Sequence, residues 1–579
     1  MKKLIAILAI LMPVLAMAQS MNVNVDSVGQ LGRQLPDSVR FKVAELKVTG
    51  PLNGADLKLL QQIVTRTKTN KKVADECLVS VIDLSEAVIV EGKEGMKTEN
   101  NVLPVALFAG AKNLAKAVLP KSAITIGNNC FDNCSGLTEV TIPETVVTIG
   151  SNAFSDCNSL RDVHLPQTLT KIGHDAFEDC TSLAVIEIPE NVVVMENNAF
   201  TACKSLTKVT ILGNIKEIGH SAFRDCAALT EITVPESVRS IGSNAFRGCK
   251  SLTAISLADD IAEIGSSSFE KCSALASVGI SKVGKIGSNA FEECSSLKSI
   301  DIEGVKKIGN GAFQKCLSLT SVHIQGSLDE LGMDTFNDCG SLSTVSLPKS
   351  IKKIESRVFM NCKSLEEIEL PSALAKMNDH VFENCSGLRF IEIPATVKDM
   401  GNSCFENCTS LDSVVVRGFM DEIEDDVFRN CHNMKSITLP VSIKKIGSDA
   451  FEQCSSLTAI SLPITLQSIG NGAFQKCAML QSIVIPAAVK EIGSNAFREC
   501  SALASAELPV GLKTIGGSAF AKCVSLREVN VNAPLPPKMA KSTFKDVVLG
   551  VCKFYVPKGC KPMYTQDKQW VKIPQLLEK

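Results

Sequence analysis

The sequence contains few of the side chains that usually build ligand clefts. Its 579 residues include one tryptophan, two tyrosines and six histidines. Sugar-binding clefts typically stack aromatic rings against their ligands, so a lectin function gains little support. The sequence also has no Gly-x-Ser-x-Gly elbow, phosphate-binding loop or His-Glu-x-x-His motif. It therefore favours a protein that is not an enzyme and that uses no cofactor or metal.

An excess of charge of either sign is also lacking. Sixty basic and 62 acidic residues give a net charge of −2 at pH 7. Nucleic acids and anionic membranes attract strongly basic surfaces, so this balance indicates neither partner. The one basic cluster, residues 66–72, is expected to be a solvated turn.

Long hydrophobic runs are limited to the N-terminus. Lys2 and Lys3 precede an apolar run over residues 4–15, and Ala16-Met17-Ala18 follows it. This pattern predicts a secretory signal peptide, residues 1–18, cleaved after Ala18. The run is too short to span a membrane, and no later stretch is long enough to do so. We expect an exported chain that is secreted or held at the cell surface, and the periplasm is also compatible.

The chain repeats one short motif. Phe-x-x-Cys recurs eighteen times between residues 131 and 523, almost always 23 residues apart. In the unit NCSGLTEVTIPETVVTIGSNAF, residues 133–154, the Leu-x-x-Val-x-Ile segment alternates and ends at Pro143, which predicts a short strand. Ala-Phe-x-x-Cys is expected to be a turn or a short helical stretch.

A glycine follows the second apolar pair in 14 of 18 units, as Gly150 follows Val146 and Ile149. It indicates either a left-handed backbone conformation or close packing of the backbone. Glu196, Glu355, Asn378 and Glu424 take its place in the other four units.

A unit of 23 residues cannot bury its strand face and its phenylalanine alone, so the units must stack. Stacking places Leu137 over Leu160 and Phe131 under Phe154. The predicted fold is a repeat solenoid of about nineteen coils, with a long parallel sheet on one face and short helical or irregular segments on the other.

The repeat resembles the Treponema-type subclass of leucine-rich repeats, with the consensus L-x-x-I-x-I-P…I-G-x-x-A-F-x-x-C. The resemblance covers about three quarters of the chain, and it extends to the entry segments LKVTGPLNGADL and IDLSEAVIVEG. It implies a right-handed leucine-rich-repeat superhelix of the BspA-like family. Members of that family are bacterial secreted or surface proteins that act in adhesion and bind host proteins.

Cysteine is abundant, with 23 residues in an expected export product. Eighteen share one repeat position, where stacking makes their Cβ vectors parallel and disfavours disulfides. A buried ladder of free thiols is expected, with Cys130 and Cys404 packed in the same way. Cys552 and Cys560 lie outside the array, and the sequence leaves open whether they form a disulfide. Cys77 has no assigned role.

The repeat also divides the chain. After the signal peptide we expect a linker over residues 19–39, an N-terminal capping segment over 40–103, the array over 104–533 and a C-terminal cap over 534–579. Tyr555, Tyr564 and Trp570 all lie in the last of these, where large amphipathic rings suit a structural cap.

The histidines are not spaced for a metal site. His174 and His220 are expected two coils apart, about 10 Å, whereas zinc ligands lie about 2 Å from their metal. His164 and His323 occupy the same strand position seven coils apart.

A partner is expected to bind the outward side of the sheet, whose residues are mostly small and polar. Glu366, Glu367, Glu369 and Glu392 gather carboxylates on adjacent rungs, which indicates a solvated acidic face or, alternatively, a site for a basic partner or Ca²⁺. Two intervals, Phe269–Phe291 and Phe291–Phe313, are shortened to 22 residues, and proline is missing from nearby strand ends. The predicted partner-binding residues are Glu187, Asp301, His323, Glu367, Glu369 and Glu392.

These observations favour an exported, non-enzymatic repeat protein that binds a macromolecule through its sheet face. A protein of the host matrix or of a bacterial surface is the expected partner, with a role in adhesion. The alternatives are a structural spacer of the envelope without a specific ligand and, third, an enzyme with a site in the entry segment or the shortened coils.

Overall fold

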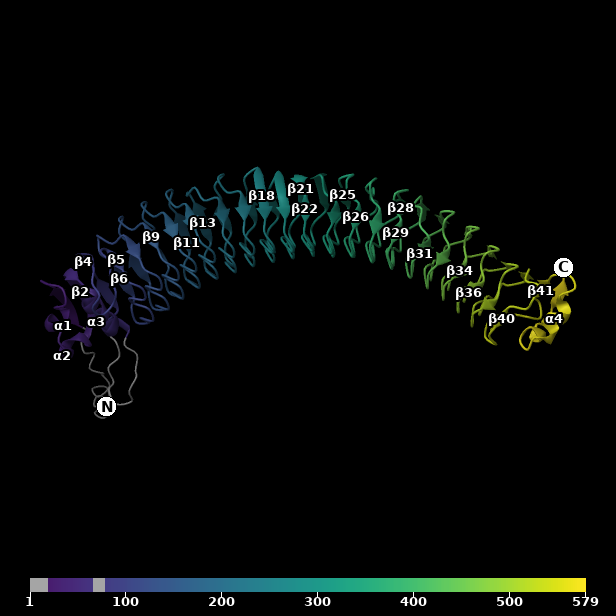
Figure 1. The fold of residues 1–579 in the computed structure, drawn as a ribbon, viewed down its shortest axis with the longest axis horizontal. Coiled ribbons are helices and arrows are strands. Elements are labelled where there is room, and N and C mark those ends of the chain that lie inside the picture. The colour runs from purple at the N-terminus through teal and green to yellow at the C-terminus, as the bar shows by residue number, and fades with distance from the viewer. Residues whose placement is uncertain (1–18, 66–78) are drawn as a thin grey trace, which may run out of the picture. The chain divides into compact units, whose positions relative to one another are not determined.

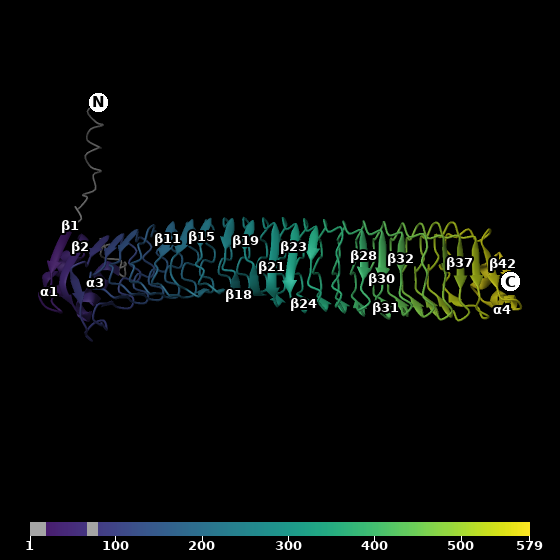
Figure 2. The same cartoon turned by 90° about the horizontal axis from the view of Figure 1, so that it is seen from above.

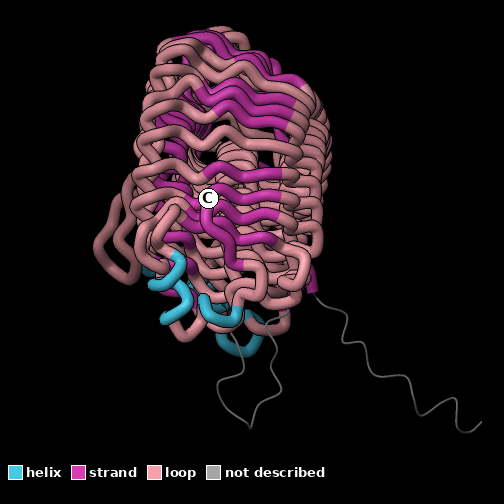
Figure 3. Tube along the Cα trace, turned by 90° about the vertical axis from the view of Figure 1, so that its right-hand side faces the viewer, coloured by secondary structure: helices cyan, strands magenta, loops and turns pink. Residues whose placement is uncertain are grey.

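The computed structural model describes residues 19–65 and 79–579. The signal peptide predicted at residues 1–18, the basic cluster at 66–72 and Cys77 lie outside the described residues. The chain divides into two compact units, residues 1–279 and 280–579, and each unit is a stack of coils (Figures 1 and 2). Strand and loop make up most of each coil and helix is rare (Figure 3).

The first unit begins with an entry segment. It consists of β1 (Gln19–Asn24), α1 (Leu31–Gln34), α2 (Asp37–Arg40), β2 (Val43–Leu52), α3 (Gly54–Thr65), β3 (Val81–Asp83) and β4 (Ala87–Ile89). Strand β3 pairs in parallel with β2 and with β6 (Lys116–Val118), so it is an early rung of the sheet. The spacing Val79-x-x-Ile82-x-Leu84, which matches the strand pattern of the repeat, predicts this. Residues 19–24, expected within a linker, pair with β2 as a strand.

Most coils of the first unit contribute a strand to each of two rows of parallel strands, called here the first and the second sheet. The Leu-x-x-Val-x-Ile segments form the first sheet, with β6, β8 (Glu139–Thr141), β11 (Val185–Ile188), β13 (Lys208–Ile211), β15 (Glu231–Thr233), β17 (Ala254–Ser256) and β19 (Ser277–Gly279). The segments before the repeated glycine form the second sheet, with β5 (Val102–Leu103), β7 (Thr125–Ile126), β9 (Thr148–Ile149), β10 (Lys171–Ile172), β12 (Val194–Met195), β14 (Glu217–Ile218), β16 (Ser240–Ile241) and β18 (Asp260–Ile264).

The second unit has the same two sheets. Its first sheet contains β21 (Ser299–Val305), β23 (Ser321–Gly326), β25 (Thr344–Ser346), β28 (Phe390–Ile393), β30 (Ser413–Val416), β32 (Ser436–Thr438), β35 (Ser482–Val484), β37 (Ser505–Leu508), β39 (Glu528–Val531), β41 (Lys553–Val556) and β42 (Leu576–Glu578). Its second sheet contains β20 (Lys282–Ile286), β22 (Lys307–Ile308), β24 (Glu330–Leu331), β26 (Lys353–Ile354), β27 (Lys376–Met377), β29 (Asp399–Met400), β31 (Glu422–Ile423), β33 (Lys445–Ile446), β34 (Ser468–Ile469), β36 (Glu491–Ile492), β38 (Thr514–Ile515) and β40 (Lys538–Met539).

Missing prolines lengthen strands in the shortened coils. Glu303 stands where most repeats have proline, and its N–H donates to the Ser281 carbonyl at 3.0 Å. Proline has no N–H to donate, which is why the other strands end there. Strand β21 therefore runs on to Val305, over seven residues.

The Ala-Phe-x-x-Cys segments are turns, and none of them is helical. Two residues of each turn have positive φ: the residue before Ala-Phe and the residue before Cys, as in Asn152 (54°) and Asp156 (57°). Asparagine and aspartate tolerate this conformation better than most residues. Phenylalanine rings stack within each unit, with centroids 5.2 Å apart for Phe154 and Phe177.

The repeated cysteines form the expected buried ladder, and their thiols are also hydrogen-bonded. Cys157 Sγ donates to the Phe131 carbonyl of the preceding coil at 3.2 Å, and that carbonyl also accepts the Cys134 N–H at 3.1 Å. Equivalent thiol–carbonyl bonds of 3.1–3.3 Å recur along both units. Burial raises the pKa of Cys134 and of Cys523 to about 12. Cys552 and Cys560 are free in the structure.

A second ladder runs beside the thiols in the second unit. Asn384, Asn407 and Asn430 each donate their side-chain amide to the side-chain oxygen of the preceding asparagine, over 2.7–2.9 Å, and the first donor, Asn361, reaches Asp338. The ladder ends at Asn430, whose buried Oδ1 has no partner among the described residues. Coil-to-coil hydrogen bonding thus extends to side chains.

Close packing explains the repeated glycine. Gly150 and its equivalents do not have positive φ. A Cβ at Gly470 would lie 2.5 Å from both C and O of Gly447 in the preceding coil. The two alternatives left open by the sequence are therefore decided in favour of close backbone packing, and left-handed conformation belongs instead to the turn residues.

The aromatic residues of the C-terminal cap pack at the end of the second unit. Trp570, in the 3₁₀ helix η1 (Trp570–Lys572), is fully buried, and its Nε1 donates to the Pro537 carbonyl at 2.8 Å. Tyr564, in α4 (Lys561–Gln566), donates its hydroxyl to the Ala533 carbonyl at 2.7 Å. Both rings therefore bury their apolar faces and satisfy their polar atoms, as a structural cap requires.

Replacing Gly470 with alanine should destabilise the second unit by about 1–3 kcal/mol, because the new methyl group meets fixed backbone rather than a movable side chain. Gly340→Ala is the matched control, since a Cβ there meets nothing within 4 Å. Urea unfolding followed by circular dichroism measures both. Equal midpoints for the two variants would contradict the close-packing explanation.

Thiol accessibility provides a second test. Cys560 is half-buried, whereas the ladder cysteines are fully buried. Titration of the native protein with a thiol-reactive disulfide reagent should consume one equivalent less in Cys560→Ser than in the wild type. Cys431→Ser should consume as much as the wild type. A lower consumption by Cys431→Ser would show that the ladder opens in solution.

Candidate partner-binding surface

In the strands of the first sheet, outward residues alternate with buried ones, so each strand presents every second side chain to solvent. In β11, Ile186 and Ile188 are buried and Glu187 is exposed. In β21, Ile300 and Ile302 are buried and Asp301 is exposed. The predicted partner-binding residues on these strands therefore do point outward.

Asp301 and His323 are brought together. They are register partners on the adjacent parallel strands β21 and β23. The His323 ring is only half-exposed, and its Nε2 lies 2.6 Å from Gln325 Nε2 in a hydrogen bond. This places an acid, an imidazole and an amide together on the face of the shortened coils.

The acidic rungs are partly neutralised by arginine. Glu392 in β28 accepts a hydrogen bond from Arg417 Nε at 2.6 Å, and Glu366 lies 3.5 Å from Arg389. These pairs reduce the repulsion expected of carboxylates on neighbouring rungs. Glu367 and Glu369 are exposed on an irregular segment of the preceding coil and make no ion pair among the described residues.

The six predicted residues therefore form separate groups. Asp301 lies beside His323, and Glu367 and Glu369 lie one coil before Glu392. Glu187 belongs to the first unit. The structure does not gather all six into one site.

The histidines on the second sheet have structural roles. His220 accepts the Ser243 N–H on Nδ1 at 3.0 Å, which places the proton of the neutral ring on Nε2. Its own backbone N–H donates to Asn197 Oδ1 at 3.0 Å, and His174 Nδ1 lies 2.7 Å from the Asn197 carbonyl. Asparagine thus separates the two histidines, as their spacing predicts. Within the two described segments, no group of three His, Cys, Asp or Glu side chains could hold a metal ion.

One carboxyl on the second sheet of the second unit is strongly perturbed. Burial and a hydrogen bond with Glu422 raise the pKa of Glu424 to about 7. Hydrogen bonds from Glu424 and Lys445 hold the pKa of Glu422 below its usual range. Glu424 borders a polar cavity of about 290 Å³ with Lys376 and Asp399, which form an ion pair at 2.6 Å. The ionisable side chains at this cavity are therefore hydrogen-bonded or ion-paired with one another.

An apolar stripe follows one edge of the first sheet in the second unit. We call it the edge stripe, and it consists of the residues that follow the strand-end prolines in four successive coils: Val441, Ile464, Ala487 and Val510. Ile464 is 85% exposed and Val441 73% exposed. Four coils at strand spacing of about 4.8 Å make a stripe roughly 14 Å long. Val484, on the outward side of β35, is exposed beside it.

The sequence contained a signal for this stripe that motif reasoning missed. In the first unit the residues after the corresponding prolines are polar: Lys121, Glu144, Gln167, Glu190 and Glu236. The same column becomes apolar from Val441 onward. Exposed apolar residues scattered singly are ordinary, whereas a contiguous row commonly marks an interaction site. Reading each repeat position as a column across coils would have found it.

The part of the chain described in the structure has no helix that is long and apolar enough to cross a membrane. A comparison of the sequence with curated proteins finds no match.

Solved structures that are similar to this chain include bacterial repeat proteins. A leucine-rich repeat protein from Bacteroides ovatus is 23% identical, covers 81% of this chain and 90% of its own, and has a TM-score of 0.30. A leucine-rich cell surface protein from Faecalibacterium prausnitzii is 25% identical, covers 60% of this chain and 86% of its own, and has a TM-score of 0.33. The leucine-rich repeat protein of T. pallidum is 21% identical over 38% of this chain and 82% of its own, with a TM-score of 0.24.

A family comparison covers the array directly. The BspA type leucine-rich repeat region matches residues 102–230, 216–342, 285–412, 329–437 and 421–547. These matches run without a gap across the array, over the same coils in which the thiol ladder, the stacked phenylalanines and the close-packed glycines recur. The chain therefore belongs to the BspA-type leucine-rich repeat family.

Proposed function

We propose that this chain is an exported repeat protein that binds a protein partner through the edge stripe and the adjoining sheet face of its second unit. The observation that carries the proposal is the exposure of Val441, Ile464 and Val510 in one row. Leaving branched apolar side chains in water forgoes burial worth about 1.5–3 kcal/mol for each, which a partner surface would recover. Protein interfaces typically surround such an apolar centre with polar groups.

The polar groups of the same unit suit this arrangement. Asp301 and His323 lie on one part of the sheet face, and Glu367, Glu369 and Glu392 lie on another. Exposed carboxylates at the rim of an interface steer a partner of opposite charge and contribute to its selection. A partner with apolar anchors and basic residues around them fits this surface. Glu187 would be outside this surface, because it belongs to the first unit.

Export and adhesion are part of the same proposal. The N-terminal sequence supports secretion through a signal peptide at residues 1–18, and the family is one of bacterial surface-type proteins. Partners would then be met outside the cytoplasm, in the host matrix or on a bacterial surface. A spacer without a ligand would have no need of an exposed apolar row.

The test uses residues 19–579, immobilised and exposed to host matrix proteins and to solubilised bacterial envelope proteins. Val441→Glu/Ile464→Glu/Val510→Glu should weaken the affinity for a captured protein at least tenfold, which corresponds to about 1.4 kcal/mol, because each charge would have to be buried at the interface. Biolayer interferometry with the purified partner measures the change.

The control variant is Val147→Glu/Val185→Glu/Val193→Glu, which changes exposed valines of the first unit. It should bind as the wild type does, and circular dichroism should show both variants folded. Equal affinity of the two variants would refute a role of the edge stripe. Failure to capture any protein from either source would favour the spacer.

A further inference from the structure

The turns containing Ala-Phe-x-x-Cys are joined by their own ladder of backbone hydrogen bonds. In most turns, three N–H groups two residues apart donate to carbonyls of the next coil. In the last complete pair of turns, Asn495 donates to Gly517, Phe497 to Ala519 and Glu499 to Ala521, over 2.8–2.9 Å. The donors therefore face the following coil, in the direction of the C-terminus.

The ladder stops at the turn over residues 540–546. Phe520 and Lys522 donate to the Thr543 and Lys545 carbonyls of this turn at 2.9 and 2.8 Å. The equivalent donors of the turn itself are the N–H groups of Ser542, Phe544 and Asp546. Within the part of the chain that the structure describes, none of the three has an acceptor. The chain does not form another turn here but leaves through β41, α4 and η1.

A cavity of about 550 Å³ lies at this unfinished edge. Its apolar lining includes Met539, Phe544, Val547, Leu549 and Ile573. Phe544, Val547 and Ile573 are buried by the surrounding structure, so the cavity is built by packed elements of the cap.

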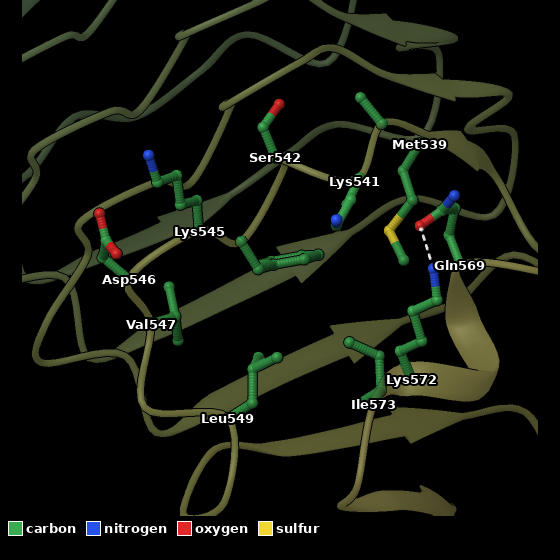
Figure 4. A pocket seen from close by; sticks show the side chains of 12 residues that line it. Met539, Lys541, Ser542, Lys545, Asp546, Val547, Leu549, Gln569, Lys572 and Ile573 are labelled. Atoms are coloured by element: carbon green, nitrogen blue, oxygen red, sulfur yellow. Dashed lines mark hydrogen bonds between the residues drawn. The ribbon is translucent and has the colours of Figure 1, made fainter.

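The edge of the cavity is basic. Lys541, Lys545 and Lys572 border it, and Asp546 is its one acidic residue (Figure 4). Lys572 Nζ donates to Gln569 Oε1 at 3.3 Å, and the three lysines make no ion pair among the described residues. An occupant that combines negative charge with an apolar group would complement both the edge and the lining.

We propose that this cavity binds an acidic peptide segment, which adds to the end of the stack as a further turn would. Three N–H groups at alternate residues match the alternate carbonyls that each following turn presents within the stack, so a peptide that adopts this turn would add to the edge much as a strand adds to a sheet. The lysines pair with the peptide's carboxylates, and one apolar side chain enters the cavity. A single carboxylate could accept from only part of this row, so the row favours a peptide over a small anion.

The chain itself supplies a suitable probe. Residues 173–181, GHDAFEDCT, form an acidic turn of the first unit. The carbonyls of His174, Ala176 and Glu178 accept N–H bonds from the preceding turn at 2.8–2.9 Å, so this sequence presents the required acceptors. The probe is this nonapeptide, acetylated, fluorescein-labelled and carrying Cys180→Ser, and fluorescence anisotropy measures its binding to the full mature chain.

The probe should bind, and Lys541→Glu/Lys545→Glu/Lys572→Glu should weaken its binding at least tenfold. Lys558→Glu/Lys561→Glu/Lys568→Glu is the matched control, because it reverses three exposed lysines of the cap that do not line the cavity, and it should bind as the wild type does. Hydrogen exchange over residues 540–547 should slow when the probe is bound, since the free N–H groups acquire acceptors. Circular dichroism should show both variants folded.

Three outcomes would overturn the proposal. Absence of binding, or binding that both triple variants weaken equally, would show that the cavity does not take the peptide. Dodecanoate binding with the same lysine dependence, in place of the peptide, would assign the cavity to an amphiphilic anion. Self-association in sedimentation equilibrium that the cavity variant alone abolishes would assign it to a second copy of the chain.

Discussion

Stacking of one coil on the next at the distance of neighbouring strands is the constraint on which the structure depends. A coil of about 23 residues buries nothing by itself, so each buried position must meet the same position of its neighbour. This explains why the phenylalanine rings stack at about 5.2 Å within each unit. It also explains the glycine column, because at Gly150 or Gly470 even one methyl group would enter the neighbouring backbone.

The same constraint gives cysteine its role. A carbonyl at the phenylalanine position accepts an N–H from its own coil and has a second lone pair facing the next coil. A buried thiol is small and weakly polar, so it packs as a hydrophobe and still donates to that carbonyl, as Cys157 does to Phe131. Serine would bring a more strongly polar group into the core, and alanine would leave the second lone pair unused. The ladder therefore needs neither oxidation nor a metal.

Repetition made much of this predictable from sequence. The period of Phe-x-x-Cys fixed the solenoid, the inward face and the thiol ladder, because a buried column leaves the same residue type in every copy. The second sheet was missed because strands of two residues, such as β9, have no alternation to recognise. The glycine was ambiguous, because close packing and positive φ both favour it. Only coordinates could show that Asn152 and Asp156 take the left-handed conformation instead.

Columns of exposed residues are free to vary between coils, in contrast to buried columns. A buried column is fixed by its neighbours above and below, whereas an exposed column can change from coil to coil at little cost to folding. The apolar residues from Val441 to Val510 and the pair Asp301 and His323 are therefore local features of an otherwise regular array. The candidate site was only partly predictable for this reason, since a motif search follows what repeats and these residues do not.

The ends of the hydrogen-bond ladders are a second place where a binding site can form. Within a ladder each donor meets its acceptor in the next coil, so any interruption leaves groups of one kind unpaired together. Asn430 ends the asparagine ladder as a single buried oxygen, which offers too little to hold a ligand. The turn at Ser542, Phe544 and Asp546 ends its ladder as three aligned donors beside an apolar cavity with a basic edge. Because contacts in a solenoid are local, changes at this edge should leave the distant coils folded, which makes binding there separable from folding.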